Sequence, residues 1–224
     1  MDILTAIFGN QVKVRILRMF LFNPETPFFL AEIVERTKCD SAAVRKILSL
    51  LLKAGLLKKR LITKEIAVAG GAKPILQDRA KPILQDRAKP ATKKLHGWSY
   101  ALNTKFIYLD QLKTFLTVSS VSANESLLKK FGSVGRLKLV VASGIFIQNW
   151  DSRVDLLLVG DELDLRRIET IIKGIEAEIG KEIAYSAFET QDFEYRQGIH
   201  DRLIRDILDY PHVTLLDRLG VEPN

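Results

Sequence analysis

Cysteine is almost absent from this sequence, since Cys39 is the only one in 224 residues. A lone cysteine excludes an internal disulfide framework and is typical of proteins that fold in a reducing compartment. No uncharged apolar run approaches the ~20 residues that span a bilayer. Lys13 and Arg15 interrupt the apolar pattern near the N-terminus, which argues against a signal peptide. We therefore expect a cytoplasmic protein.

The sequence also lacks the usual motifs of metal and phosphate sites. Its three histidines, His96, His200 and His212, are scattered and have no ligand spacing. No glycine-rich loop that would cradle a phosphate is present. We therefore expect no metal and no cofactor, and we assign no catalytic residue.

Positive charge is unevenly distributed along the chain, whose formal net charge is +7. Residues 1–117 contain 21 Lys and Arg and 9 Asp and Glu, whereas residues 118–224 contain 13 and 18. A basic half joined to an acidic half suggests that only the first meets a polyanion. A nucleic acid and an acidic membrane would both be attracted by such charge, so the local pattern has to separate them.

The basic half contains a series of amphipathic helices. Apolar residues at helical spacing predict helices over Val12–Phe22 and Phe29–Lys38. A third helix begins after Asp40 or Ser41, either of which can cap it, and ends at Gly55. One side of this third helix is expected to face a core, and it consists of Val44, Ile47, Leu48 and Leu51.

A β-hairpin is predicted directly after the third helix. Its strands are expected at Leu56–Thr63 and at His96–Asn103, which alternates apolar and polar residues. Two helices joined by a tight turn and followed by a hairpin resemble the winged helix-turn-helix of transcription regulators of the MarR/ArsR type. The resemblance covers about residues 3–106, and the stretch that carries it is Ser41–Leu57, SAAVRKILSLLLKAGLL.

The resemblance implies that the third helix enters the major groove of double-stranded DNA. Arg45 is the candidate for bidentate readout of guanine, and Ser41 or Ser49 for contact with a phosphate or a base edge. Lys46 and Lys53 are interpreted as phosphate contacts. The complete set of predicted DNA-binding residues is Ser41, Ala42, Arg45, Lys46, Ser49, Lys53, Lys58, Lys59, Arg60, Lys73, Arg79, Lys81, Arg87, Lys89, Lys93 and Lys94.

The wing between the two strands, about residues 62–96, contains an eight-residue tandem repeat. AKPILQDR is written twice at residues 72–90, with the start of a third copy. Prolines at every eighth position disfavour a regular ladder, so we expect a mobile basic loop. A neutral duplication and an arm that contacts DNA phosphates both stay open as interpretations. Trp98 and Tyr100 on the second strand are interpreted as hairpin packing rather than as base-stacking groups.

The acidic half predicts a second domain at residues 123–224, joined through a linker helix and hinge at 107–122. The linker helix is expected at Tyr108–Thr117. Strands are expected at Arg136–Ser143, Ser152–Gly160, Lys181–Phe188 and His212–Asp217, and helices at Leu163–Gly180, from Thr190 onward and at Arg202–Asp209. This order predicts a mixed sheet covered by helices.

The stretch SGIFIQNWDSRVDLLLVGD (residues 143–161) resembles the core of the minimal nucleotidyltransferases. That family has a Gly-Ser turn and, about ten residues later, an Asp-x-Asp pair whose carboxylates hold catalytic metals. Here the turn is inverted as Ser143-Gly144, Asp155 matches the second carboxylate, and Arg153 stands where the first belongs. The family has a third carboxylate on the following strand, and Glu182, near the start of that strand, is only a weak substitute for it. The resemblance therefore implies the fold with a degenerate site, in which Arg153 pairs with Asp155 or a neighbouring acid, or binds an anion.

These patterns predict an α+β protein with an N-terminal winged helix-turn-helix, an enlarged wing and a C-terminal nucleotidyltransferase-like domain with a mixed sheet. The predicted function is a DNA-binding transcription regulator whose second domain, a pseudoenzyme, serves dimerisation or sensing. A homodimer is expected, because helix-turn-helix domains usually read two half-sites. The alternatives are an active nucleotidyltransferase that the winged helix targets to nucleic acid, and a winged helix that binds a protein.

Overall fold

The computed structural model describes residues 3–67, 92–118, 124–149 and 152–221. The contacts divide these residues into two compact units. The first contains residues 3–67, 92–118 and 173–181, and the second contains residues 124–149, 152–172 and 182–221. Each unit has helices and a sheet, which agrees with the predicted α+β class. None of the helices in the described ranges is long and apolar enough to cross a membrane.

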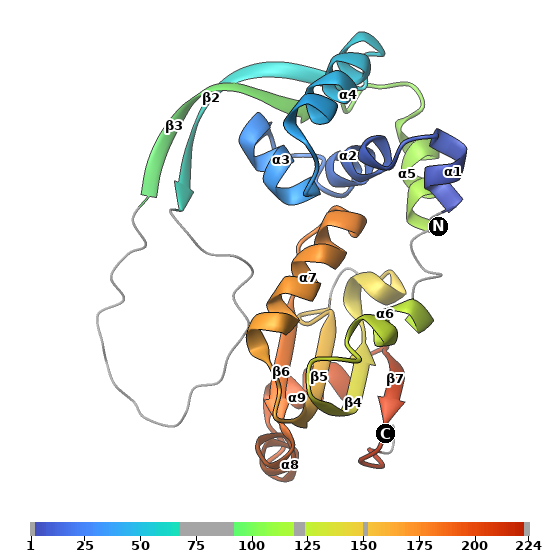
Figure 1. The fold of residues 1–224 in the computed structure, drawn as a ribbon, viewed down its shortest axis with the longest axis vertical. Coiled ribbons are helices and arrows are strands. Elements are labelled where there is room, and N and C mark those ends of the chain that lie inside the picture. Colours follow the sequence, from blue (N-terminus) through green and yellow to red (C-terminus); the bar gives the residue numbers. More distant parts are fainter. Residues whose placement is uncertain (1–2, 68–91, 119–123, 150–151, 222–224) are drawn as a thin grey trace. The chain divides into compact units, whose positions relative to one another are not determined.

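The first unit consists of helices packed on a small antiparallel sheet (Figure 1). The sheet has the order β1-β3-β2, with both pairings antiparallel. Strand β1 was not predicted, because two residues are too short to show an alternating pattern. The elements in chain order are α1 (Ile3–Phe8), α2 (Gln11–Phe22), β1 (Phe28–Phe29), α3 (Leu30–Thr37), α4 (Ser41–Lys53), β2 (Leu57–Ala67), β3 (Thr92–Leu102) and α5 (Leu109–Val118).

Helix α4 begins where the sequence predicts. The Asp40 carboxylate accepts hydrogen bonds from the amides of Ala42 and Ala43, at 2.9 and 3.1 Å, and so caps the first turn. Gly55 follows the helix with a φ of +78°, a left-handed conformation that suits glycine. The predicted core side is confirmed, because its four residues are all buried: Val44, Ile47, Leu48 and Leu51.

The hairpin of β2 and β3 is longer than the sequence analysis assumed. Its register runs from Leu57 opposite Leu102 to Ala67 opposite Thr92. Residues 64–67 and 92–95 are therefore paired strand as well, and the predicted strand ends at Thr63 and His96 are wrong. The tandem repeat at 72–90, and with it the expectation of a mobile loop, lies outside the described residues.

The helix predicted at Tyr108–Thr117 is α5. It packs on the first core, which is the cluster of buried apolar residues in the first unit. Leu116 is 1% exposed within that core, and Leu109 and Leu112 pack against it. Phe115 also contacts Phe8 of α1 edge-on, with ring centroids 6.3 Å apart. This helix therefore belongs to the first unit.

The second unit is built on a mixed sheet, as predicted. The sheet has the order β6-β5-β4-β7, in which β5 and β6 are parallel and the other pairs antiparallel. The elements are α6 (Asn124–Lys130), β4 (Arg136–Ala142), the 3-10 helix η2 (Gly144–Ile147), β5 (Leu156–Asp161), α7 (Leu165–Ile179), β6 (Tyr185–Glu189), α8 (Thr190–Gly198), α9 (Arg202–Leu208) and β7 (Val213–Asp217). The part of α7 from Lys173 onward is grouped with the first unit. Helix α6 was not predicted.

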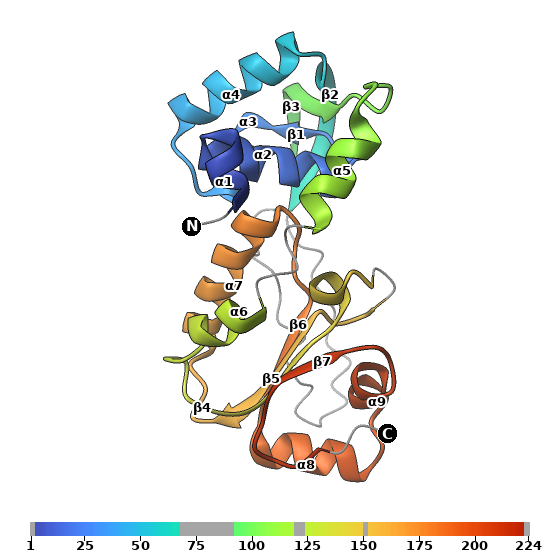
Figure 2. The same cartoon turned by 90° about the vertical axis from the view of Figure 1, so that its right-hand side faces the viewer.

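Helices cover both faces of this sheet. Figure 2 shows α6 and α7 along one face and α8 and α9 along the other. Leu139 and Leu157 of the sheet share a buried cluster with Phe193 of α8 and Ile204 of α9. Two predicted strand starts are wrong, because β5 starts at Leu156 and not at Ser152, and β6 starts at Tyr185 and not at Lys181. Asp155 therefore precedes β5.

Candidate nucleic-acid interface

The outer side of α4 carries the residues predicted to contact DNA. Ser41, at the first position of the helix, is half-buried. The remaining predicted contacts of this helix are all exposed: Ala42, Arg45, Lys46, Ser49 and Lys53. In Figure 2 the helix runs along the surface of the first unit. Because the opposite side of α4 is buried in the core, this polar side stays accessible.

Among the described residues, the cations of α4 have no ion-pair partner. Arg45, Lys46 and Lys53 form no ion pair within the described part of the chain. Exposed cations of this kind are hydrated and attract counter-ions that a polyanion such as DNA can replace. The helix therefore presents three uncompensated positive charges beside Ser49, a small side chain with one donor and two acceptor positions.

Strand β2 continues the basic surface, but it divides its cations between two faces. Lys58, Lys59 and Arg60 are all exposed. Successive residues of a strand point to opposite faces, so Lys58 and Arg60 share one face and Lys59 lies on the other. The Lys59 ammonium lies 4.9 Å from the ring centroid of Trp98, a cation–π distance. Three consecutive basic residues therefore do not form one contact surface.

Trp98 corrects one interpretation of the sequence. It is 57% exposed, so it is not buried by hairpin packing, although one of its contacts is with Lys59 of the facing strand. Tyr100, two residues later, does pack against the first core as expected. Tyr100 lies opposite Phe28 of β1, whereas the pairing of β3 with β1 ends at Ser99 and does not include Trp98.

Only two of the predicted basic wing residues lie within the described part of the chain. Lys93 and Lys94 belong to β3, opposite Ile66 and Glu65, and Lys94 is exposed. The five remaining predicted wing contacts lie outside the described residues: Lys73, Arg79, Lys81, Arg87 and Lys89. Their predicted contact with phosphates stays a prediction.

The residues that resemble a nucleotidyltransferase site come together in the second unit, with one exception. The Ser143 amide donates to the Asp155 carbonyl at 2.9 Å. A Cβ on Gly144, whose φ is +53°, would overlap the Asp155 carboxylate. Arg153 is the exception, because its guanidinium turns to Asp206 of α9, with Nη1 and Oδ2 2.7 Å apart. Of the expected partners, Arg153 therefore binds another acid and not Asp155.

Both carboxylate oxygens of Asp155 accept hydrogen bonds from the backbone. Oδ1 accepts from the Ile145 amide and Oδ2 from the Ala184 amide, each at 2.8 Å. The carboxylate thereby ties the turn before η2 to the chain entering β6. Glu182 is exposed at that end of the chain. No group of three or more His, Cys, Asp or Glu side chains in the described ranges is arranged to hold a metal.

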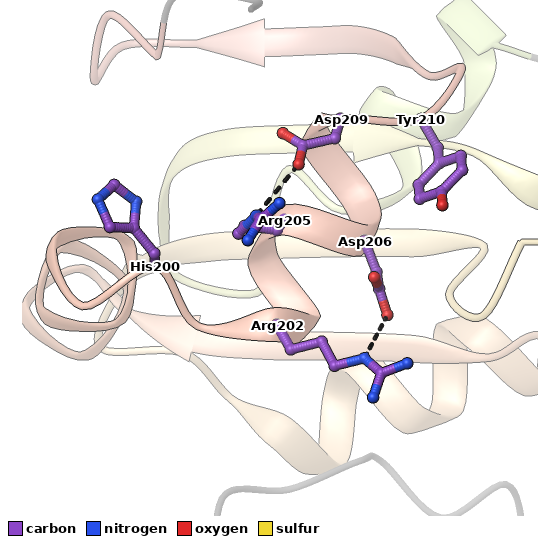
Figure 3. Close-up of a pocket in the computed structure, with 6 residues that line it drawn as sticks. All are labelled: His200, Arg202, Arg205, Asp206, Asp209 and Tyr210. Carbon is purple, nitrogen blue, oxygen red and sulfur yellow. Dashed lines mark hydrogen bonds and ion pairs between the residues drawn. The ribbon is translucent and has the colours of Figure 1, made fainter.

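A depression of about 540 Å³ lies on the second unit, at α9 and the turns on either side of it (Figure 3). It was not predicted from the sequence, in which His200 was noted only as one of three scattered histidines. A signal was present, because four charged residues recur at positions that share one side of a helix. Its lining residues are His200, Arg202, Arg205, Asp206, Asp209 and Tyr210.

Comparison with protein-family models, with curated proteins and with solved structures finds no match to this chain. Its function has to be inferred from its own residues.

Proposed function

We propose that the chain is a transcription regulator that binds double-stranded DNA through a winged helix-turn-helix in its first unit. The observation that carries the proposal is the exposed basic side of α4, on which Arg45, Lys46 and Lys53 have no acidic partner among the described residues. The polar side of a surface helix usually carries charges of both signs. A polar side with positive charges alone favours contact with a polyanion.

The order of elements in the first unit supports the same proposal. A short strand between α2 and α3, a tight turn between α3 and α4, and a hairpin after α4 are the parts of a winged helix. Lys38, with a φ of 51°, turns the chain between α3 and α4. In this arrangement α4 lies in the major groove, Arg45 reads a base, and Lys58 and Arg60 contact the backbone.

The second unit is proposed to be a nucleotidyltransferase-like domain without transfer activity. Asp155 matches one carboxylate of the resembling family, and its two oxygens each accept a hydrogen bond from a backbone amide, which supports a structural role. Metal ions in such sites are held by carboxylates in pairs, and Arg153 stands where the second is expected. We propose dimerisation or sensing as the role of this unit, in a regulator that acts as a homodimer in the cytoplasm.

The proposal is tested by measuring DNA affinity at several salt concentrations. Wild type should bind duplex DNA, and log Kd should rise linearly with log salt, with a slope of ~0.9 for each phosphate contacted. Arg45→Ala should cost ~1–3 kcal/mol and relax the preference at one base position. Lys113→Ala, which removes an exposed cation of α5, is the matched control and should leave affinity unchanged.

Three other outcomes would contradict the proposal in different ways. No binding to any duplex at low salt would favour the winged helix as a protein-binding module. Equal losses in Arg45→Ala and Lys113→Ala would mean attraction by net charge rather than by α4. Magnesium-dependent nucleotidyl transfer by wild type, abolished in Asp155→Asn, would establish the enzyme alternative.

A further inference from the structure

The depression at α9 is a candidate ligand site that the proposed DNA function does not use. Its guanidinium groups are more exposed than its carboxylates, at 85% for Arg202 and 63% for Arg205 against 21% for Asp206 and 36% for Asp209. His200 and Tyr210 are exposed as well. The accessible polar atoms are therefore mostly hydrogen-bond donors, which suits an anionic ligand.

The acidic side chains of the depression are already engaged. Asp206 binds Arg153, which does not line the depression, with 2.7 Å between Nη1 and Oδ2, whereas the Nε of Arg202 lies 3.8 Å from the same oxygen. Arg153, the closer partner, compensates the negative charge of Asp206, so the positive charge of Arg202 is left largely uncompensated. An anion that reaches the depression would consequently meet net positive charge.

Both ion pairs within the depression also leave the ends of the guanidinium groups accessible. Arg202 faces Asp206 through Nε, and Arg205 donates to Asp209 through Nε at 3.3 Å (Figure 3). The terminal nitrogens of both arginines form no hydrogen bond within the described part of the chain. Each guanidinium can therefore present two N–H groups to one oxyanion, the geometry that binds phosphate oxygens best.

The walls of the depression are held in place by contacts behind it. The ion pair of Arg196 with Asp201, at 3.0 Å, joins the end of α8 to the start of α9, and both side chains are largely buried. Asp201 also caps α9 by accepting from the Leu203 amide at 2.8 Å. His200 sits in this corner with a φ of 53°. A fixed corner lowers the entropy that a ligand would lose on binding.

Tyr210 supplies the apolar part of the site. Its side chain is 62% exposed at the far end of α9, and its carbonyl contacts the His212 ring at 2.8 Å. An exposed phenol ring that lines the same depression as two arginines fits a ligand that joins a flat ring to an anion. A phosphomonoester matches the two forks better than a carboxylate, because it has three terminal oxygens and a charge of about −1.5 to −2 at neutral pH.

We propose that this depression binds a small phosphomonoester that carries an aromatic ring. Its phosphate lies between the guanidinium groups of Arg202 and Arg205, and its ring lies against Tyr210. The site is separate from the Ser143-Gly144 turn and Asp155, and its occupancy does not depend on whether the first unit binds DNA. Such a ligand would make the second unit a sensor of phosphorylated metabolites.

The test uses the full chain, phenyl phosphate as the probe, and amide NMR shifts as the readout. We expect saturable shifts confined to residues 200–210. Arg202→Ala and Arg205→Ala should each weaken binding about tenfold or more, since each removes a charge-assisted contact. Arg166→Ala, which removes an exposed arginine of α7, is the matched control and should bind as wild type does.

A second pair of probes separates the two halves of the ligand. Inorganic phosphate should bind more weakly than phenyl phosphate, and Tyr210→Ala should remove that difference without abolishing phosphate binding. Phenol should not produce the shifts. The proposal is overturned if phenyl phosphate gives no saturable shift up to about 10 mM. It is equally overturned if the double variant Arg202→Ala/Arg205→Ala binds phenyl phosphate as tightly as Arg166→Ala does.

Discussion

Replacing Asp155 with alanine should destabilise the second unit rather than relieve a strained carboxylate. The change leaves the amides of Ile145 and Ala184 without their acceptor, since each donates to Asp155 at 2.8 Å. A partly buried donor that loses its partner costs about 1–3 kcal/mol. Because both hydrogen bonds are only partly buried, we expect a total of about 2–4 kcal/mol, from the lower part of that range for each.

The sign of this effect separates a structural carboxylate from a catalytic one. A metal-ligating carboxylate without its metal is repelled by the other acids of the site. Replacing it with a neutral residue therefore usually stabilises the fold. Asp155 instead satisfies two backbone donors, and its loss removes both hydrogen bonds. Asp155→Asn should be destabilised as well, because its amide NH₂ would face one of the two N–H groups.

Hydrogen exchange measured by mass spectrometry is the assay, because the chain has two units and need not unfold in one step. Peptides that cover residues 139–147 and 183–188 should lose protection in Asp155→Ala, while peptides of the first unit should not change. Glu194→Gln, at an exposed position of α8, is the control and should exchange as wild type does. Unchanged or increased protection near Ile145 would refute the structural account of Asp155.

Three further predictions concern other parts of the molecule. Gly144→Ala should destabilise the second unit as Asp155→Ala does, because φ is +53° and the added Cβ would overlap the Asp155 carboxylate; a urea midpoint equal to wild type would contradict this. Lys58→Ala and Arg60→Ala should each reduce the salt slope of DNA binding by ~0.9, whereas Lys59→Ala, on the other face, should leave it nearly unchanged; equal reductions in the three variants would disprove the division of faces. Asp40→Ala should lower the melting temperature of the first unit by removing the cap of α4, at a cost of about 1 kcal/mol, and calorimetry would show it.

The regular elements of this chain were largely predictable from local pattern. The buried side of α4, with Val44 and Ile47, follows from helical spacing alone, and its start follows from Asp40. The mixed sheet follows from the order of strands and helices. Local pattern failed where pairing decides the outcome, as in β1, which exists because Phe28 and Phe29 pair with β3. The extension of the hairpin to Ala67 has the same cause.

The candidate sites were predictable only in their residue types. Asp155 was singled out for its resemblance to a metal ligand, but its two partners lie 10 and 29 residues away in sequence. Arg153 was expected to pair with Asp155 or a neighbouring acid, or to bind an anion, and because the strand starts only at Leu156 it turns to Asp206. Such contacts depend on the packing of α9 against the sheet, which no spacing in the sequence encodes.

The central claim is that α4 reads DNA sequence, and selection of bound duplexes from a random pool tests it most directly. The account predicts an enriched motif with two related half-sites, and a loss of preference at one position of each half-site in Arg45→Ala. Binding without enrichment would contradict sequence readout and leave a protein that coats DNA through charge. Recovery of no DNA at low salt would contradict the DNA-binding function itself.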